Sequence, residues 1–165
     1  HEPIKSTPLP PAPWSDLSVD FFGPLDSHGY LLVTVDDYSR YPIVQVVHST
    51  SADATIAKLD ETLAMFGIRD VIKTDNGPPF QSDKFHLYAK NIGFKHKRIT
   101  PAHPQANGEA ERFMQNLKKV IRSATIERRS WKQALQDFLR NYRVTPHRTT
   151  GRPPASLIFR YTPGT

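Results

Sequence analysis

The sequence contains no cysteine in its 165 residues. This excludes disulfide bonds and a thiolate zinc site within the chain. Long hydrophobic runs are also missing: no stretch approaches the roughly 20 apolar residues that a membrane-spanning helix needs, and no signal-peptide pattern is present. With 38% hydrophobic residues, the chain suits one globular domain with a sizeable core, and we expect no membrane partner.

Acidic residues are scarce in the second half of the chain. Residues 83–165 carry 17 lysines and arginines against 5 aspartates and glutamates, whereas residues 1–82 carry 5 against 11. The net charge of +6 therefore combines an acidic half with a strongly basic half. A basic surface suits a polyanionic partner, most commonly the phosphate backbone of a nucleic acid. An ordinary soluble basic surface is the alternative interpretation.

Prolines are concentrated at the start of the chain. Five of them, Pro3, Pro8, Pro10, Pro11 and Pro13, fall within residues 1–13. Such a segment favours an extended backbone without a core, so we interpret residues 1–13 as a linker in preference to a ligand for an SH3 domain. We expect one core domain over residues 14–160 and a short tail over residues 161–165.

Hydrophobic patterning in the core domain predicts three strands, followed by alternating helices and strands. Short connections favour an antiparallel meander for the first three strands, and the fourth strand, entered from a helix, is expected to run parallel to the first. The predicted fold class is α/β, with one five-stranded mixed sheet flanked by helices. The expected strands cover residues 14–22, 30–35, 43–47, 70–74 and 94–99, with Gly23-Pro24 ending the first, and the expected helices cover 51–66, 82–92, a segment after Gly108, and 130–143.

The helix that begins after Gly108 has one apolar stripe and one charged flank. Glu111 lies off the stripe, and at about 100° per residue Lys118 and Arg122 share its flank. On an arbitrary helix, such a flank is usually a solvated face with favourable charge pairing. The stripe consists of Ala110, Phe113, Leu117, Val120, Ile121 and Ala124.

Two aspartates upstream favour a functional interpretation of Glu111. Asp20 lies inside the apolar run Leu17–Phe22, where an ionised side chain is costly unless something pairs with it. Asp75, in the motif TDNG, is expected at the end of a strand, and 35 residues separate it from Glu111. A further acidic pair, Asp36 and Asp37, is expected to cap a turn rather than to bind a metal.

These three carboxylates, with their order and spacing, resemble the Asp/Asp/Glu triad of retroviral and gypsy-type retrotransposon integrases. The loop HPQANGEAER at residues 103–112 and the segments TPH and TGRPP within residues 145–154 also resemble the gypsy type. The resemblance extends from about Trp14 to about Phe159. It implies a ribonuclease-H-like fold, in which Asp20 and Asp75 face each other on neighbouring strands and a helix brings in Glu111.

The resemblance also implies a cofactor and a reaction. Two Mg²⁺ or Mn²⁺ ions are expected, with Asp20 bridging both, Asp75 binding one and Glu111 the other, and no small-molecule cofactor is expected. The implied activity is that of a polynucleotidyl transferase and endonuclease, which trims the 3′ ends of the element's DNA and joins them to target DNA. We expect this to occur in the nucleus, with element and target DNA as partners and with the chain in a homo-oligomer, at least a dimer.

The resemblance points to DNA contacts around the same helix. Lys118 and Arg122, together with the adjacent Lys119, are expected to hold the element's DNA ends, with a solvated flank as the alternative. His103, Gln105 and Asn107 match a loop that touches the terminal bases, although His103 could instead hydrogen-bond within the loop. Met114 is expected to pack at the edge of the apolar stripe rather than to touch DNA.

Two other functions remain open from the sequence. One is another nuclease of the same superfamily, such as a transposase or a ribonuclease H, although the HPQANGEAER loop argues against ribonuclease H. The other is a host-domesticated integrase domain that binds DNA or protein without catalysis. Because no His/Cys cluster accompanies the proline-rich linker, we expect the chain to be an integrase core without the family's N-terminal zinc-binding domain.

Overall fold

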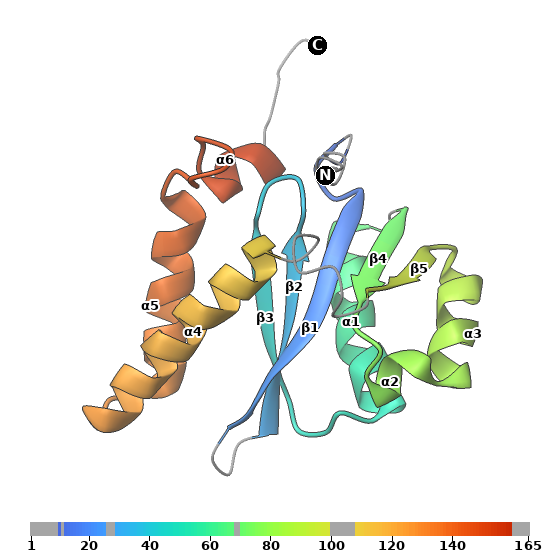
Figure 1. Cartoon of the computed structure of the whole chain (residues 1–165), viewed down its shortest axis with the longest axis horizontal. Helices are drawn as coiled ribbons and strands as arrows, with labels where there is room; N and C mark the ends of the chain where they lie inside the picture. Colours follow the sequence, from blue (N-terminus) through green and yellow to red (C-terminus); the bar gives the residue numbers. More distant parts are fainter. Residues whose placement is uncertain (1–9, 11, 26–28, 68–69, 100–107, 160–165) are drawn as a thin grey trace, which may run out of the picture.

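The computed structural model describes residues 10, 12–25, 29–67, 70–99 and 108–159, and for residues 108–110 only the backbone. A single sheet with the strand order β3-β2-β1-β4-β5 forms its centre. Figure 1 shows α4 and α5 at one side of the molecule, with α1, α2 and α3 at the other. The strands are β1 (Asp16–Leu25), β2 (Gly29–Asp36), β3 (Pro42–Val47), β4 (Val71–Thr74) and β5 (Lys95–Arg98), and the helices are α1 (Ala52–Phe66), α2 (Pro78–Gln81), α3 (Asp83–Ile92), α4 (Gly108–Ile126), α5 (Trp131–Val144) and α6 (Pro154–Ile158).

Strand pairing confirms the predicted mixed sheet. β1, β2 and β3 form an antiparallel meander, and β4 pairs parallel with both β1 and β5. The predicted end of β1 at Gly23-Pro24 was wrong. The strand shifts register between Phe22 and Leu25, and its pairing with β2 then resumes opposite Gly29. A bulge of this kind lets a strand continue past residues that would otherwise end it.

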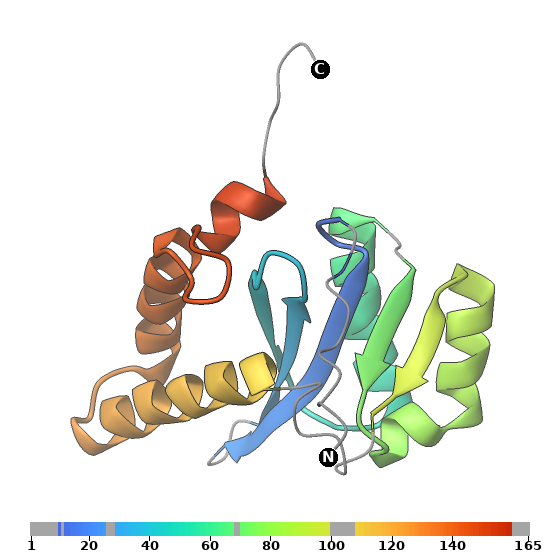
Figure 2. The ribbon, with the colours of Figure 1, turned by 45° about the horizontal axis from the view of Figure 1, so that its top comes forward.

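Alternate residues of each strand point to opposite sides of the sheet, and apolar side chains are buried on both faces, whereas β5 is mostly exposed. Figure 2 shows the same arrangement from another angle. On one face, Leu17, Val19, Leu32 and Ile72 belong to an apolar cluster that includes residues of α1 and α3. On the other face, Leu31, Val33 and Val35 join a second cluster with Phe113, Leu117, Leu135 and Leu139 of α4 and α5.

The predicted stripe of α4 faces the sheet and α5. Phe113, Leu117, Ile121 and Ala124 are all buried. Phe138 of α5 stacks against Phe113, with ring centroids 5.7 Å apart, and the half-buried Trp131 packs against the same cluster. The large apolar residues of α5 therefore contribute to the core of this chain.

Capping residues define the helix ends close to the predicted positions. The hydroxyls of Ser51, Ser82 and Ser130 each accept a backbone N–H at the start of α1, α3 and α5, as N-cap serines commonly do. Gly93 ends α3 with φ of 100°, a left-handed conformation that favours glycine. The short helices α2 and α6, each with proline in the first turn, were not predicted. None of the described helices is long and apolar enough to cross a membrane.

Candidate active site

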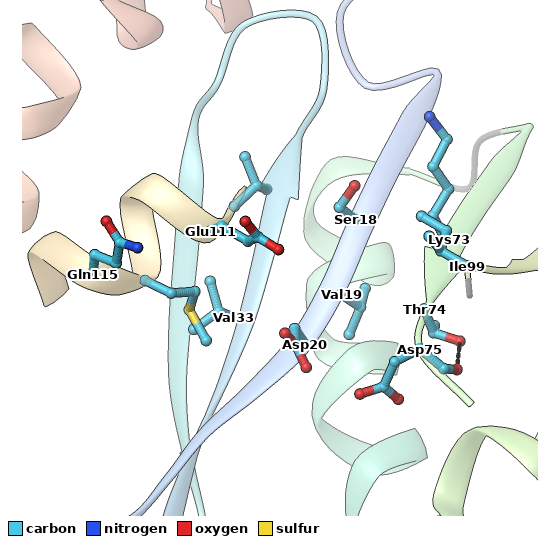
Figure 3. A pocket seen from close by; sticks show the side chains of 12 residues that line it. Ser18, Val19, Asp20, Val33, Lys73, Thr74, Asp75, Ile99, Glu111 and Gln115 are labelled. Carbon is cyan, nitrogen blue, oxygen red and sulfur yellow. Dashed lines mark hydrogen bonds between the residues drawn. The ribbon is translucent and has the colours of Figure 1, made fainter. Parts of the chain in front are cut away.

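Asp20 and Asp75 meet at the face of the sheet that carries α4. β1 and β4 pair in parallel with Leu17 opposite Ile72 and Ser18 opposite Lys73. Continuing that register brings Asp20 level with Asp75, which follows the last residue of β4. Figure 3 shows the two carboxylates directed toward each other. Local backbone bonds hold both in place: the N–H of Phe21 donates to Asp20 Oδ1 at 2.8 Å, and the N–H of Gly77 donates to Asp75 Oδ1 at 2.7 Å.

The surroundings of Asp20 favour its protonated form. Its side chain reaches solvent at the mouth of a cleft, but the protein around the carboxyl group limits its hydration. This desolvation is the largest cause that raises the pKa of Asp20 from 3.8 to about 6, and the negative charge of Asp75 adds to the rise. The Phe21 N–H acts in the opposite direction. An acidic group with a raised pKa beside a second carboxylate, in a cleft, marks a candidate functional site.

Glu111 lies on the same cleft, in the second turn of α4. The cleft has a volume of about 300 Å³, and its polar lining includes Asp20, Asp75, Glu111, Gln115 and Lys73. Figure 3 shows the Glu111 carboxylate directed from α4 into the space beside β1. The structure therefore brings the three predicted carboxylates, from β1, from the end of β4 and from α4, to one cleft.

The three carboxylates do not converge on a single point. Within the described part of the chain, no three acidic or histidine side chains lie close enough together to hold one metal ion. The donor set nevertheless suits Mg²⁺ or Mn²⁺, because it offers only carboxylate oxygens. No ion pair among the described residues involves Asp20, Asp75 or Glu111, so these oxygens are not neutralised by a cationic side chain. Asp20 and Asp75 are thus two adjacent candidate ligands, and Glu111 is a third on the same cleft.

The predicted DNA-contact residues fall into two groups. Lys118, Lys119 and Arg122 are exposed on α4, beyond Glu111 along the helix. His103, Gln105 and Asn107 lie outside the described residues. Met114 packs against the apolar cluster of α4 and α5 and also lines the cleft, as expected for the edge of the stripe.

The two aspartates at the β2–β3 turn, Asp36 and Asp37, have different roles. The Asp36 carboxylate accepts the Ser39 N–H and hydroxyl at 3.0 and 2.6 Å, which confirms the predicted turn cap. It also accepts the backbone N–H of Trp14 at 2.8 Å. Asp37 instead forms an ion pair with Lys73 at 3.1 Å.

Sequence reasoning did not identify Lys73 and Ser18, which also line the cleft. Each lies two residues before a candidate metal ligand on the same strand or its end, and residues two apart in a strand share a face. That spacing was a usable signal for Ser18 beside Asp20 and for Lys73 beside Asp75. The ion pair with Asp37 depends on the register between strands, which the sequence does not display.

Comparison with known proteins identifies the family. Residues 10–104 match the family model described as the integrase core domain. The uncharacterized protein K02A2.6 of Caenorhabditis elegans is 38% identical over 158 residues, which cover 95% of this chain and 12% of that protein. The Tf2-3 transposon polyprotein of Schizosaccharomyces pombe is 32% identical over 172 residues, covering 99% of this chain and 13% of the polyprotein. The chain thus spans about an eighth of the length of these relatives.

Solved structures show the same fold at low sequence identity. A chain of the simian T-cell lymphotropic virus intasome in complex with PP2A regulatory subunit B56 gamma aligns with a TM-score of 0.78, at 19% identity, covering 93% of this chain and 57% of that one. The HTLV-2 integrase catalytic core domain in complex with magnesium, in its dimeric form, aligns with a TM-score of 0.71 at 20% identity, covering 90% and 98%. The predicted ribonuclease-H-like fold is therefore confirmed, and the chain belongs to the integrase core domain family of retrotransposons and retroviruses.

Proposed function

We propose that this domain is a catalytically active integrase core, which uses a divalent metal to process the 3′ ends of element DNA and to join them to target DNA. The observation that carries the proposal is the placement of Asp20 and Asp75, side by side on one cleft that Glu111 also lines. Phosphodiester chemistry places additional negative charge on the reacting phosphate, and a site of hard oxygen ligands is suited to cations that stabilise it.

Three carboxylates would hold the metal. Asp20, between the other two, would bridge two ions, while Asp75 would bind one of them and Glu111 the other. Bound there, the ions would stabilise the attacking and the leaving oxygen of a phosphodiester. Each ion would then need only two of the three carboxylates, which is compatible with described side chains that do not gather three acids around one point.

The proposed reaction needs no nucleophile from the protein. In the first step, a water oxygen attacks a phosphorus atom near the 3′ end of the element DNA, and the bond to the neighbouring 3′ oxygen breaks, which frees a terminal 3′-hydroxyl. In the second step, that hydroxyl attacks a target phosphodiester and displaces a target 3′ oxygen. The chain's contribution is to orient the DNA over the cleft and to fix the acidic ligands beneath it.

The basic half of the chain supplies the proposed DNA surface. Lys118, Lys119 and Arg122 are all exposed on α4. Lys118 and Arg122 follow Glu111 along one flank of the helix, whereas Lys119 lies beside residues of α5. Cationic side chains in this position would bind backbone phosphates of the element DNA without reading its sequence. We also assign His103, Gln105 and Asn107 to contacts with the terminal bases, on the family resemblance alone.

We further propose that the domain acts in the nucleus as a homo-oligomer. The HTLV-2 integrase core occurs in dimeric and trimeric forms, and that likeness supports the oligomer. The candidate surfaces are the outer faces of α1 and α5. Met65, with 76% of its surface exposed on α1, and Val144, with 62% exposed at the end of α5, are large apolar residues on these helices.

A second candidate function is a DNA- or protein-binding module derived from an integrase. It is considered because, among the described residues, no three acidic side chains gather around one point. A strand-transfer assay with a pre-cut DNA end, in Mg²⁺ or Mn²⁺, separates the two. Because an isolated core can be limited to the reverse reaction, disintegration is measured in parallel. Metal-dependent products in either assay support the integrase, whereas DNA binding without products supports the binding module.

A further inference from the structure

Directly beside the two acidic strand positions lies a second pair of polar residues. Ser18 and Lys73 are register partners on β1 and β4, two residues before Asp20 and Asp75 respectively. Figure 3 shows Ser18 above Asp20 along β1 and Lys73 above Asp75 along β4. Because side chains two residues apart in a strand share a face, both pairs project from the same side of the sheet, and both line the cleft.

One carboxylate connects the two members of this second pair. Asp37, which follows β2, accepts the Ser18 hydroxyl on Oδ1 at 2.7 Å, and its Oδ2 lies 3.1 Å from Lys73 Nζ. The backbone N–H of Asp37 also donates to the carbonyl of Asp16 on β1 at 2.9 Å. Asp37 therefore connects β1 to β4. The connected residues lie two positions before Asp20 and Asp75, on the same face of the sheet.

This bridge differs from an ordinary surface ion pair. The side chains of Lys73 and Asp37 are only 12% and 14% exposed, whereas those of the surface pair Lys84 and Asp53 are 66% and 75% exposed. Withdrawing two charges from water is costly, so a buried pair contributes little net stability and is better explained by the geometry that it fixes. Here the pair fixes how β1 lies beside β4, and the placement of these two strands sets the distance between Asp20 and Asp75.

We propose that Lys73 and Asp37 are positioning residues that hold Asp20 and Asp75 at the spacing a divalent cation requires. The proposal rests on the metal-binding function proposed above, and it concerns residues that would touch neither the metal nor the DNA. Partners outside the ligand shell commonly change metal affinity by roughly 10- to 100-fold when they are removed.

A purely electrostatic role of Lys73 predicts the opposite change in cation affinity from a positioning role. Lys73 is a positive charge near an acidic site, so its removal should strengthen the binding of a cation if charge were its only effect. Removal should weaken binding if Lys73 fixes the spacing of the ligands. The direction of the change in affinity therefore distinguishes positioning from simple charge.

The experiment is calorimetric titration of the folded protein with Mn²⁺, in the absence of DNA, for the wild type, Lys73→Met, Asp37→Asn and the double variant. We expect each variant to bind Mn²⁺ at least about tenfold more weakly, with the double variant close to the worse single variant because both remove one bridge. Lys84→Met, which breaks the exposed pair with Asp53, is the matched control and should leave the affinity unchanged.

Unchanged or tighter Mn²⁺ binding in both Lys73→Met and Asp37→Asn, beside a wild type that binds Mn²⁺, would overturn the positioning role and leave the proposed function intact. If the wild type binds no Mn²⁺, both proposals fall. Because Lys73→Met leaves the Asp37 carboxylate, only 14% exposed, without the lysine and could lower the yield of folded protein, Asp37→Asn provides a second comparison, in which Lys73 keeps Asp16 as a neighbour at 4.0 Å. A loss of melting temperature with an unchanged Mn²⁺ affinity would identify the bridge as structural only.

Discussion

Asp20 on β1 and Asp75 at the end of β4 face each other on the α4 side of the sheet, and the negative charge of Asp75 disfavours ionisation of Asp20. Limited hydration, followed by the charge of Asp75, raises the pKa of Asp20 to about 6. A proton on Asp20 and a divalent cation between the two groups relieve the same repulsion. Protons and metal ions are therefore expected to compete for this position.

The raised pKa of Asp20 predicts a defined pH dependence of stability in the absence of metal. The folded protein holds this proton more tightly than the unfolded chain, so the contribution to stability is complete below the ordinary value of 3.8 and is lost as the pH rises through about 6. Melting temperatures of the wild type and Asp20→Asn, compared between pH 4 and pH 7 in metal-free buffer, test this. The wild type should lose stability relative to the variant across that range, and parallel curves would show that Asp20 titrates normally.

Divalent metal should stabilise the folded domain through the same carboxylates. Mg²⁺ or Mn²⁺ at millimolar concentration is expected to raise the melting temperature of the wild type, because a ligand that binds only the folded state adds stability. The shift should largely disappear in Asp75→Asn. Asp70→Asn is the control, since Asp70 is an exposed acid just before β4. Equal shifts in the wild type and Asp75→Asn would mean that the ions bind elsewhere.

Burial of α4 against the sheet should carry a large share of the stability. Leu117 is fully buried, whereas Ile126, at the end of the same helix, is 72% exposed. Leu117→Ala is expected to lower the free energy of unfolding by about 2–5 kcal/mol, the usual cost of a core truncation. Ile126→Ala should change it by less than about 0.5 kcal/mol. Urea denaturation measures both, and similar losses in the two variants would contradict the observed orientation of α4.

The sequence was sufficient to predict the elements with strong local signals. Serine caps and the apolar stripes of the long helices predicted their starts to within about one residue, because these features act within a few residues of chain. The short helices α2 and α6 were missed since each begins with proline and no periodic stripe can develop over 4 or 5 residues. The continuation of β1 past Gly23-Pro24 depends on pairing with β2, which local patterns do not reveal.

The sequence was sufficient to predict that three carboxylates come to one cleft, but not which contacts surround them. Asp20 could be predicted because an acid within an apolar run is unusual. Asp75 and Glu111 could be predicted from their spacing and from the family resemblance. The signal for Lys73 was weaker: it lies two residues before Asp75, but an isolated lysine in a strand is usually solvated. Its partner Asp37 lies 36 positions earlier in the chain, and only the strand register brings the two together.

Lys118 should act on DNA binding rather than on chemistry. It is exposed on α4, beyond the cleft residues Glu111, Met114 and Gln115. Lys118→Ala is expected to weaken DNA binding and to reduce the salt dependence of the affinity by roughly one phosphate contact. Saturating DNA should restore part of the activity. DNA affinity measured over a salt series tests this, and an unchanged affinity and salt slope would identify the charged flank of α4 as a solvated helix face.

The most direct test of the proposed catalytic triad is turnover of Glu111→Gln at saturating DNA in Mg²⁺ or Mn²⁺. The amide keeps the shape of the side chain but removes the charge that a metal ligand needs, so we expect turnover to collapse while DNA binding is retained or improved. Gln115→Ala, at a neighbouring position of the same cleft, is the matched control and should keep most of the activity. Near-normal turnover in Glu111→Gln would contradict the proposed role of Glu111 as a metal ligand and, with it, the catalytic triad.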